Sequence, residues 1–152
     1  MKKNFAIVVI FFIVFITLKS SPHPLAPLRN SERGWGEVKI AGQNVKVELA
    51  MTPEEQALGL SGRDELKEDE GMLFVFSQPG NYPFWMKDMN FEIDIIWISE
   101  DKRVIYIKKD ARPESYPEIY GPENSVKYVL EVVSGFSDKN DLQVGDGVLF
   151  TY

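Results

Sequence analysis

The folded part of the chain is predicted from two apolar runs near its middle, residues 71–76 (GMLFVF) and 93–98 (IDIIWI). Both runs are rich in β-branched and aromatic residues and are too short for helices, so they predict buried strands. Residues 38–40 and 45–49 alternate apolar and charged side chains around the polar turn at 41–44. Such alternation is typical of a hairpin with one face in water.

One short helix and three further strands complete the predicted pattern. Thr52 is a good N-cap, Pro53 suits the first helical position, and Glu55 closes a capping box. Because Gly59 breaks the helix, we expect it near residues 53–58. The further strands are expected over residues 103–109, 126–134 and 148–152. Seven short strands without regular βαβ alternation predict a mainly β fold, a small antiparallel β-barrel or sandwich with this one helix.

The N-terminal segment has a different pattern from the rest of the chain. Two lysines near the start precede an almost unbroken apolar run over residues 5–18, which is typical of a secretory signal and short for a membrane span. We therefore expect residues 1–21 to be a signal peptide or an uncleaved N-terminal anchor. Residues 22–36 are a Pro-rich linker, and residues 37–152 are a single β domain. The domain is predicted to be exported, periplasmic or extracellular, with membrane contact only through the N-terminal segment.

Charge and composition exclude several classes of function. The net charge is −6, and loss of three lysines with residues 1–21 would leave −6 − 3 = −9. An acidic domain is poorly suited to phosphate backbones, so we predict no nucleic-acid partner. There is no cysteine, and the one histidine, His23, lies in the linker. Thiolate zinc sites, cysteine nucleophiles and Ser-His-Asp triads are therefore excluded from the folded part.

No metal or other cofactor is predicted. The acidic stretch at residues 64–70 lacks the spaced oxygen ligands of a calcium loop, so it is interpreted as a solvated loop. The sequence makes no prediction of the oligomeric state.

The candidate site comes from charges placed inside apolar segments. Asp94 begins one buried run, Lys87 ends the FWMK motif beside Trp85, and Glu131 interrupts the strand at 126–134. A buried carboxylate needs a cationic partner and hydrogen bonds, for which Lys87 and Arg63 are the natural candidates. We therefore predict that Arg63, Lys87, Asp94 and Glu131 meet near one rim of the barrel. The alternative is that these charges support the fold or face water.

Several linked motifs resemble one family. They are Gly59-Leu60-Ser61-Gly62-Arg63 with Leu66, Gly71–Phe76, Phe84–Lys87, Ile93–Ile96, Tyr128–Glu131 with Gly135, and Gly145-Asp146. This succession is similar to the domain of unknown function 192 family. The resemblance implies a small, mostly β domain, often behind a signal sequence in bacteria and archaea. It implies no established activity, ligand or catalytic residue.

The leading functional prediction is a non-catalytic binding module. In this hypothesis Arg63 and Lys87 hold a small polar or anionic ligand, and Trp85 provides an apolar wall. Asp94 and Glu131 orient the two cations.

Two alternatives belong to other classes. A hydrolase of envelope carbohydrate would use Asp94 and Glu131, which must then face one cleft roughly 5–10 Å apart. A protein interaction module would instead dock a partner on the exposed hairpin edge or on the long loop at residues 110–125.

Overall fold

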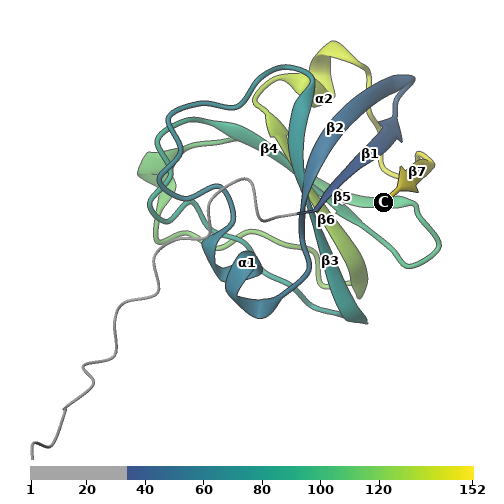
Figure 1. The fold of residues 1–152 in the computed structure, drawn as a ribbon, viewed down its shortest axis with the longest axis horizontal. Helices are drawn as coiled ribbons and strands as arrows, with labels where there is room; N and C mark the ends of the chain where they lie inside the picture. The colour runs from purple at the N-terminus through teal and green to yellow at the C-terminus, as the bar shows by residue number, and fades with distance from the viewer. Residues whose placement is uncertain (1–33) are drawn as a thin grey trace, which may run out of the picture.

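The seven predicted strands form one sheet. The computed structural model describes residues 34–152, so the predicted signal and nearly all of the linker lie outside the described residues. The strand order is β5-β4-β6-β3-β2-β1-β7 (Figure 1). The strands are β1 Trp35–Ile40, β2 Gln43–Ala50, β3 Glu70–Gly80, β4 Ile93–Ile98, β5 Val104–Ala111, β6 Val126–Val133 and β7 Val148–Thr151.

The sheet is mixed, which corrects the prediction of a purely antiparallel one. All neighbouring strands are antiparallel except β2 and β3, where Val47 pairs with Gly71 in a parallel ladder. Helix α1 (Pro53–Leu58) and the loop after it carry the chain back before β3 begins. Parallel neighbours require such a crossover connection. The helix between two strands was predicted, but its effect on strand direction was missed.

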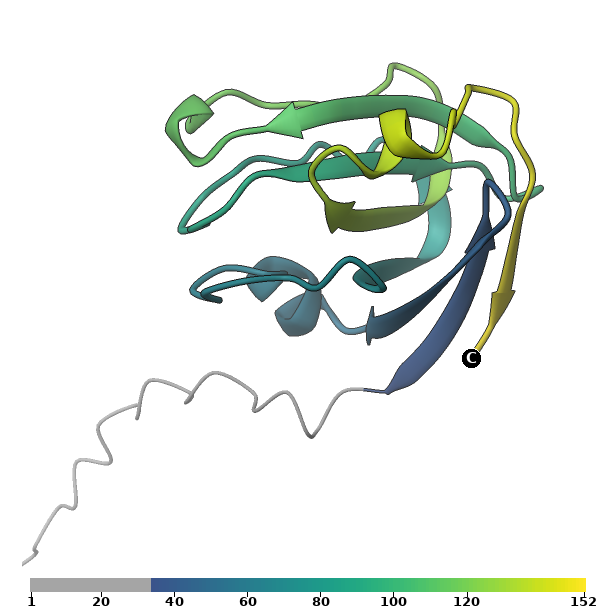
Figure 2. The ribbon, with the colours of Figure 1, turned by 90° about the horizontal axis from the view of Figure 1, so that it is seen from above.

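The sheet curls into a half-barrel whose edge strands meet at one end. Arg103 forms an isolated bridge with Gly147, and the Val104 amide donates to the Asp146 carbonyl at 2.9 Å. Figure 2 shows the curl from above, with β4 and β5 on one side and β1 and β2 on the other. The predicted exposed hairpin edge is wrong, because β1 pairs with β7 and β2 with β3.

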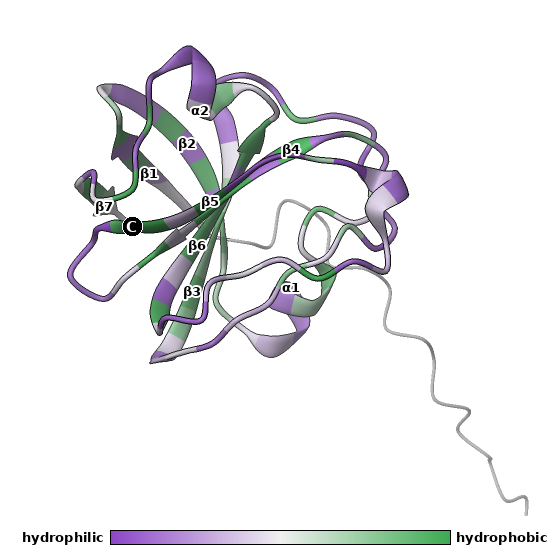
Figure 3. Cartoon of the chain, turned by 180° about the vertical axis from the view of Figure 1, so that it is seen from behind, coloured by the Kyte–Doolittle hydropathy of each residue, from purple (hydrophilic) through white to green (hydrophobic). Residues whose placement is uncertain are grey.

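Both faces of the central strands are buried. All seven strands contribute to the cluster inside the curl, which includes Leu73, Ile96 and Leu130. A second cluster lies on the outer face, where the segment at residues 82–91 covers Phe74 and Trp97. Figure 3 shows the apolar positions concentrated along the strands. Every residue of β4 is buried, which explains why its sequence is apolar at every position except Asp94 rather than alternating.

The predicted helix start is confirmed in detail. The Glu55 amide donates to Thr52 Oγ1 at 3.2 Å, and the Thr52 amide donates to the Glu55 carboxylate at 2.9 Å. A second helix, α2 (Phe136–Lys139), and the 3₁₀ turn η1 (Pro113–Ser115) were not predicted. Within residues 34–152 no helix has the length and apolar character needed to cross a bilayer.

Candidate functional site

A cavity of about 250 Å³ lies on the outer face of the sheet. Its walls come from the end of α1 and the following loop, from β3, from the segment between β3 and β4, and from one residue of β6. The lining residues include five aromatic side chains, Phe74, Phe76, Tyr82, Phe84 and Trp85. Lys87 and Glu131 are the two charged residues among those that line it. An aromatic cavity with few polar groups is the usual form of a small-molecule site.

The loop after α1 and the turn after the FWMK motif hold one another in place. Ser61 Oγ donates to the Lys87 carbonyl at 3.0 Å, and the Gly62 amide donates to the Asp88 carbonyl at 2.8 Å. Asn90 Nδ2 donates to the Arg63 carbonyl at 2.8 Å. These three bonds join segments about 26 residues apart, as in the Ser61–Lys87 pair. They set the rim of the cavity and the direction of the Arg63 side chain.

The strand register places two acids in one row on the outer face. Glu48 of β2 pairs with Met72 of β3, Met72 pairs with Glu131 of β6, and Glu131 pairs with Ile95 of β4. Adjacent strands lie about 4.8 Å apart, so Glu48 and Glu131 are separated by roughly 10 Å of sheet. Met72 lies between them.

Arg63 is paired with Glu48. Its Nη1 donates to Glu48 Oε1 at 2.6 Å and its Nη2 to Glu48 Oε2 at 2.5 Å. Glu48 is only 4% exposed, so this is a largely buried bidentate pair. Sequence reasoning missed Glu48, because the alternating pattern of its strand suggested a wet face. The one available signal was the need of a buried Arg63 for an acidic partner.

Glu131 is buried without a full set of hydrogen bonds. It is 5% exposed, and its Oε2 has no hydrogen-bond partner among the described residues. Burial raises the pKa of the Glu131 carboxyl to about 8, although the Arg63 guanidinium opposes this shift. The carboxyl is therefore mostly protonated at neutral pH.

Trp85 and Lys87 form the exposed rim. Trp85 is 50% exposed and packs edge-to-face on Tyr116, with ring centroids 5.7 Å apart. The Lys87 ammonium lies 6.0 Å from the centre of the Trp85 ring, within the range of a cation–π contact. Both residues line the cavity, as does Glu131.

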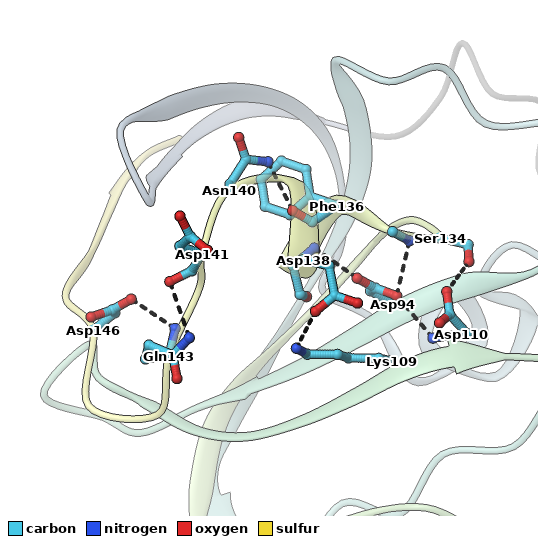
Figure 4. Close-up of polar contacts among 12 residues, drawn as sticks. Asp94, Lys109, Asp110, Ser134, Phe136, Asp138, Asn140, Asp141, Gln143 and Asp146 are labelled. Carbon is cyan, nitrogen blue, oxygen red and sulfur yellow. Dashed lines mark hydrogen bonds and ion pairs between the residues drawn. The ribbon is translucent and has the colours of Figure 1, made fainter.

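Asp94 does not belong to this site. It pairs with Val132, so its side chain points to the opposite face of the sheet from Glu131. Its carboxylate accepts from the amides of Asp110 at 2.9 Å, Gly135 at 3.3 Å and Ser137 at 2.8 Å (Figure 4). The prediction that Asp94 meets Arg63, Lys87 and Glu131 is therefore wrong.

The family model DUF192, described as an uncharacterized ACR, matches residues 36–150. The chain belongs to the DUF192 family. The resemblance noted from the motifs is thereby confirmed. No match was found among curated proteins.

Two crystal structures share the DUF192 fold. One is a Sinorhizobium meliloti 1021 protein named only provisionally as a transcription regulator, with 28% identity and a TM-score of 0.73, covering 78% of this chain and 95% of that one. The other is a Novosphingobium aromaticivorans DSM 12444 protein of unknown function, with 32% identity and a TM-score of 0.71, covering 84% of this chain and 89% of that one.

The other polar side chains that line the cavity of this DUF192 domain have already used their donors. Gln56 Nε2 donates to the carbonyls of Ala50 at 3.3 Å and Val75 at 3.0 Å. The Tyr82 hydroxyl donates to the Gln78 carbonyl at 2.7 Å, and Ser61 donates to a carbonyl as described above. What these three side chains retain for a ligand is oxygen lone pairs. The cavity is therefore rich in hydrogen-bond acceptors.

Proposed function

We propose that this DUF192 protein is a binding module and that its outer-face cavity takes a small molecule. The observation that carries the proposal is the buried Glu131 carboxyl, which lines an aromatic cavity and has one oxygen without a partner in the described part of the chain. A buried polar group without a partner is destabilising, and such groups are concentrated at functional sites. A ligand that bonds to Glu131 would remove this cost.

The size of the cavity limits the ligand. An apolar cavity of about 150 Å³ accepts a molecule such as benzene. The 250 Å³ of this cavity therefore suits a body of one aromatic ring with a short polar arm. We infer that the ring contacts the aromatic walls while the polar arm reaches Glu131.

The anionic ligand predicted from the sequence loses its main support. Both terminal nitrogens of Arg63 bond to Glu48, so Lys87 is the remaining cation at the cavity. The hydrolase alternative is wrong for Asp94 and Glu131, because opposite faces of one sheet cannot form a shared cleft. Transcription regulation is not carried over from the Sinorhizobium meliloti neighbour, since a net charge of −6 disfavours DNA.

The proposal is tested with single-ring fragments and a variant that fills the cavity. Fragments that bind should shift backbone amide resonances of residues around the cavity and raise the melting temperature. Stabilisation reaches about 2.7 kcal/mol when the free ligand is at a hundredfold excess over its Kd. Ala57→Phe, at an exposed lining position, should abolish binding, whereas Glu54→Phe on the same helix and outside the cavity should not. Binding that survives Ala57→Phe would contradict the proposal.

We also propose export of the domain, as the sequence predicts. The support is the basic and apolar pattern of residues 1–21, which lie outside the described residues. Fusing residues 1–36 to a reporter that is active only after export should yield activity. Replacing three central residues of the apolar run with lysines should remove that activity.

A further inference from the structure

We infer that the ligand of this cavity is a small primary amine whose ammonium pairs with Glu131. This inference rests on the proposed binding function and adds the chemical class of the ligand. It is drawn from the charge balance of the site, from the hydrogen-bonding capacity of the lining side chains, and from the aromatic walls.

The charge balance leaves one carboxyl unmatched. Glu48 and Arg63 neutralise one another through two short hydrogen bonds. Glu131 lies in the same row of the sheet, and no group of residues 34–152 forms such a bond to its Oε2. An ammonium brought by a ligand would displace the proton of the Glu131 carboxyl and pair with the resulting carboxylate. A ligand carboxylate would instead face an acid.

Lys87 does not already fill this role. Its side chain is exposed, and its ammonium lies over the Trp85 ring at the rim of the cavity. Among residues 34–152, the other charged groups near Glu131 are Glu48 on β2, in the same row of the sheet, and Arg63 in the loop after α1. Lys87 therefore repels a ligand ammonium weakly and attracts a ligand anion. A substitution of Lys87 consequently distinguishes between these two classes of ligand.

The uncharged polar side chains of the cavity call for a hydrogen-bond donor on the ligand. Ser61, Gln56 and Tyr82 have given their hydrogens to backbone carbonyls, so they present acceptors. An ammonium carries three donors and no acceptor, whereas a carboxylate carries acceptors only. These three side chains therefore match the amine and not the acid.

The aromatic walls add to the same preference. Phe74 and Phe84 pack edge-to-face with centroids 4.8 Å apart, and Phe76 stacks on Tyr82 at 3.5 Å. Together with Trp85 they give the cavity an aromatic lining, and an aromatic ring attracts a cation that lies over its face. Aromatic linings recur at protein sites that recognise quaternary ammonium groups.

The test uses probes of one scaffold that differ only in the polar group. They are 2-phenylethylamine, 2-phenylethanol and phenylacetate, titrated calorimetrically into the purified protein at pH 7. The amine should bind at least about tenfold more tightly than the other two, since hydrogen bonds between charged groups are the stronger ones. Amine binding should release a proton, because the mostly protonated Glu131 carboxyl must ionise to pair with the ammonium. The release is measured as a dependence of the binding heat on the ionisation enthalpy of the buffer.

Two variants test which residues produce the preference for the amine. Glu131→Gln should abolish both the amine preference and the proton release. Lys87→Met should leave amine binding intact or strengthen it severalfold, whereas it would weaken an anion. Glu37→Gln and Lys39→Met, exposed on β1, are the matched controls and should change neither.

The outcomes separate this inference from the binding function. Equal binding of amine and alcohol, tighter binding of the acid, or an amine preference that survives Glu131→Gln would overturn the inference and leave the binding function standing. Failure of all three probes to bind at the cavity would overturn both. A lysine side chain presents the same ammonium, so Nα-acetyl-lysine methylamide is titrated as well. Tighter binding of this compound than of phenylethylamine supports the inference and identifies a peptide as the source of the amine.

Discussion

Asp94 and Glu131 lie on paired strands one register position apart, so their carboxyl groups face opposite sides of the same sheet. Each is buried, but their surroundings differ. Asp94 accepts three backbone amide hydrogens, whereas Glu131 retains an oxygen without a partner among residues 34–152. A carboxylate that accepts from three amides supports the fold, whereas a carboxyl with an unpartnered oxygen can bond to a ligand. The difference between these two acids leads to the first two predictions.

We expect Glu131→Gln to stabilise the protein in a pH-dependent manner. The folded-state pKa of about 8 lies above the ordinary value of 4.5. The Glu131 carboxyl therefore lowers the free energy of unfolding only at pH values at which it is ionised in the unfolded chain. The stability of wild type relative to the variant should therefore fall as pH rises from about 4.5 to about 8 and then level off. The full effect is on the order of 5 kcal/mol, at 1.36 kcal/mol per pKa unit.

Urea unfolding of both proteins between pH 4 and 9 measures this difference. Glu37→Gln, on an exposed position of β1, should track wild type at every pH. A difference that stays constant with pH would show that Glu131 is ionised in the folded protein.

We expect Asp94→Asn to destabilise the fold without altering the cavity. The amide cannot accept all of the hydrogens from Asp110, Gly135 and Ser137, and two of these belong to the segment that begins α2. The expected loss is on the order of 3 kcal/mol, because these bonds are made to a charged acceptor. Chemical denaturation gives the loss. The matched control is Asp138→Asn, whose side chain is exposed and pairs with Lys109, and it should cost under about 1 kcal/mol.

We expect Arg63 and Glu48 to be strongly coupled. Arg63→Met alone removes the bidentate cation from the buried Glu48 carboxylate and should cost about 3–5 kcal/mol. Replacing both residues with methionine should recover most of that loss, because the desolvated charges are then removed together. A double-mutant cycle of unfolding free energies measures the coupling. If the stability losses of the two single variants simply add in the double variant, Arg63 and Glu48 are not coupled, which would contradict the geometry of the ion pair.

We expect Gly71→Ala to disturb the strand that carries Glu131. A Cβ at Gly71 would lie 2.7 Å from the backbone carbonyl oxygen of Glu131, so β3 and β6 would have to separate. The expected cost is about 1–3 kcal/mol, typical of overpacking. Gly147→Ala is the control, since its Cβ would meet only a side-chain atom of Arg103 at 3.7 Å. Equal stability of the two variants would contradict this account.

Much of the fold could be predicted because its signals are local. The alternation over β1 and β2, the apolar runs of β3 and β4, and the capping box at Thr52 all depend on neighbours within a few residues. The direction of β3 relative to β2 depends on where the crossover returns. Helix α2 was missed because its four residues carry no periodic signal, and its first turn is capped by Asp94 from a strand 43 residues away.

For the site, the sequence alone selected Lys87, Trp85 and Glu131, because a charge or an aromatic side chain interrupts an apolar pattern there. Only the tertiary structure decided that these three residues share a cavity, that Arg63 is committed to Glu48, and that Asp94 faces the other way. The period of a strand determines which of its residues lie on one face. What covers that face, and which buried acid finds donors, is set by segments far away in the chain and becomes fixed only when the sheet closes.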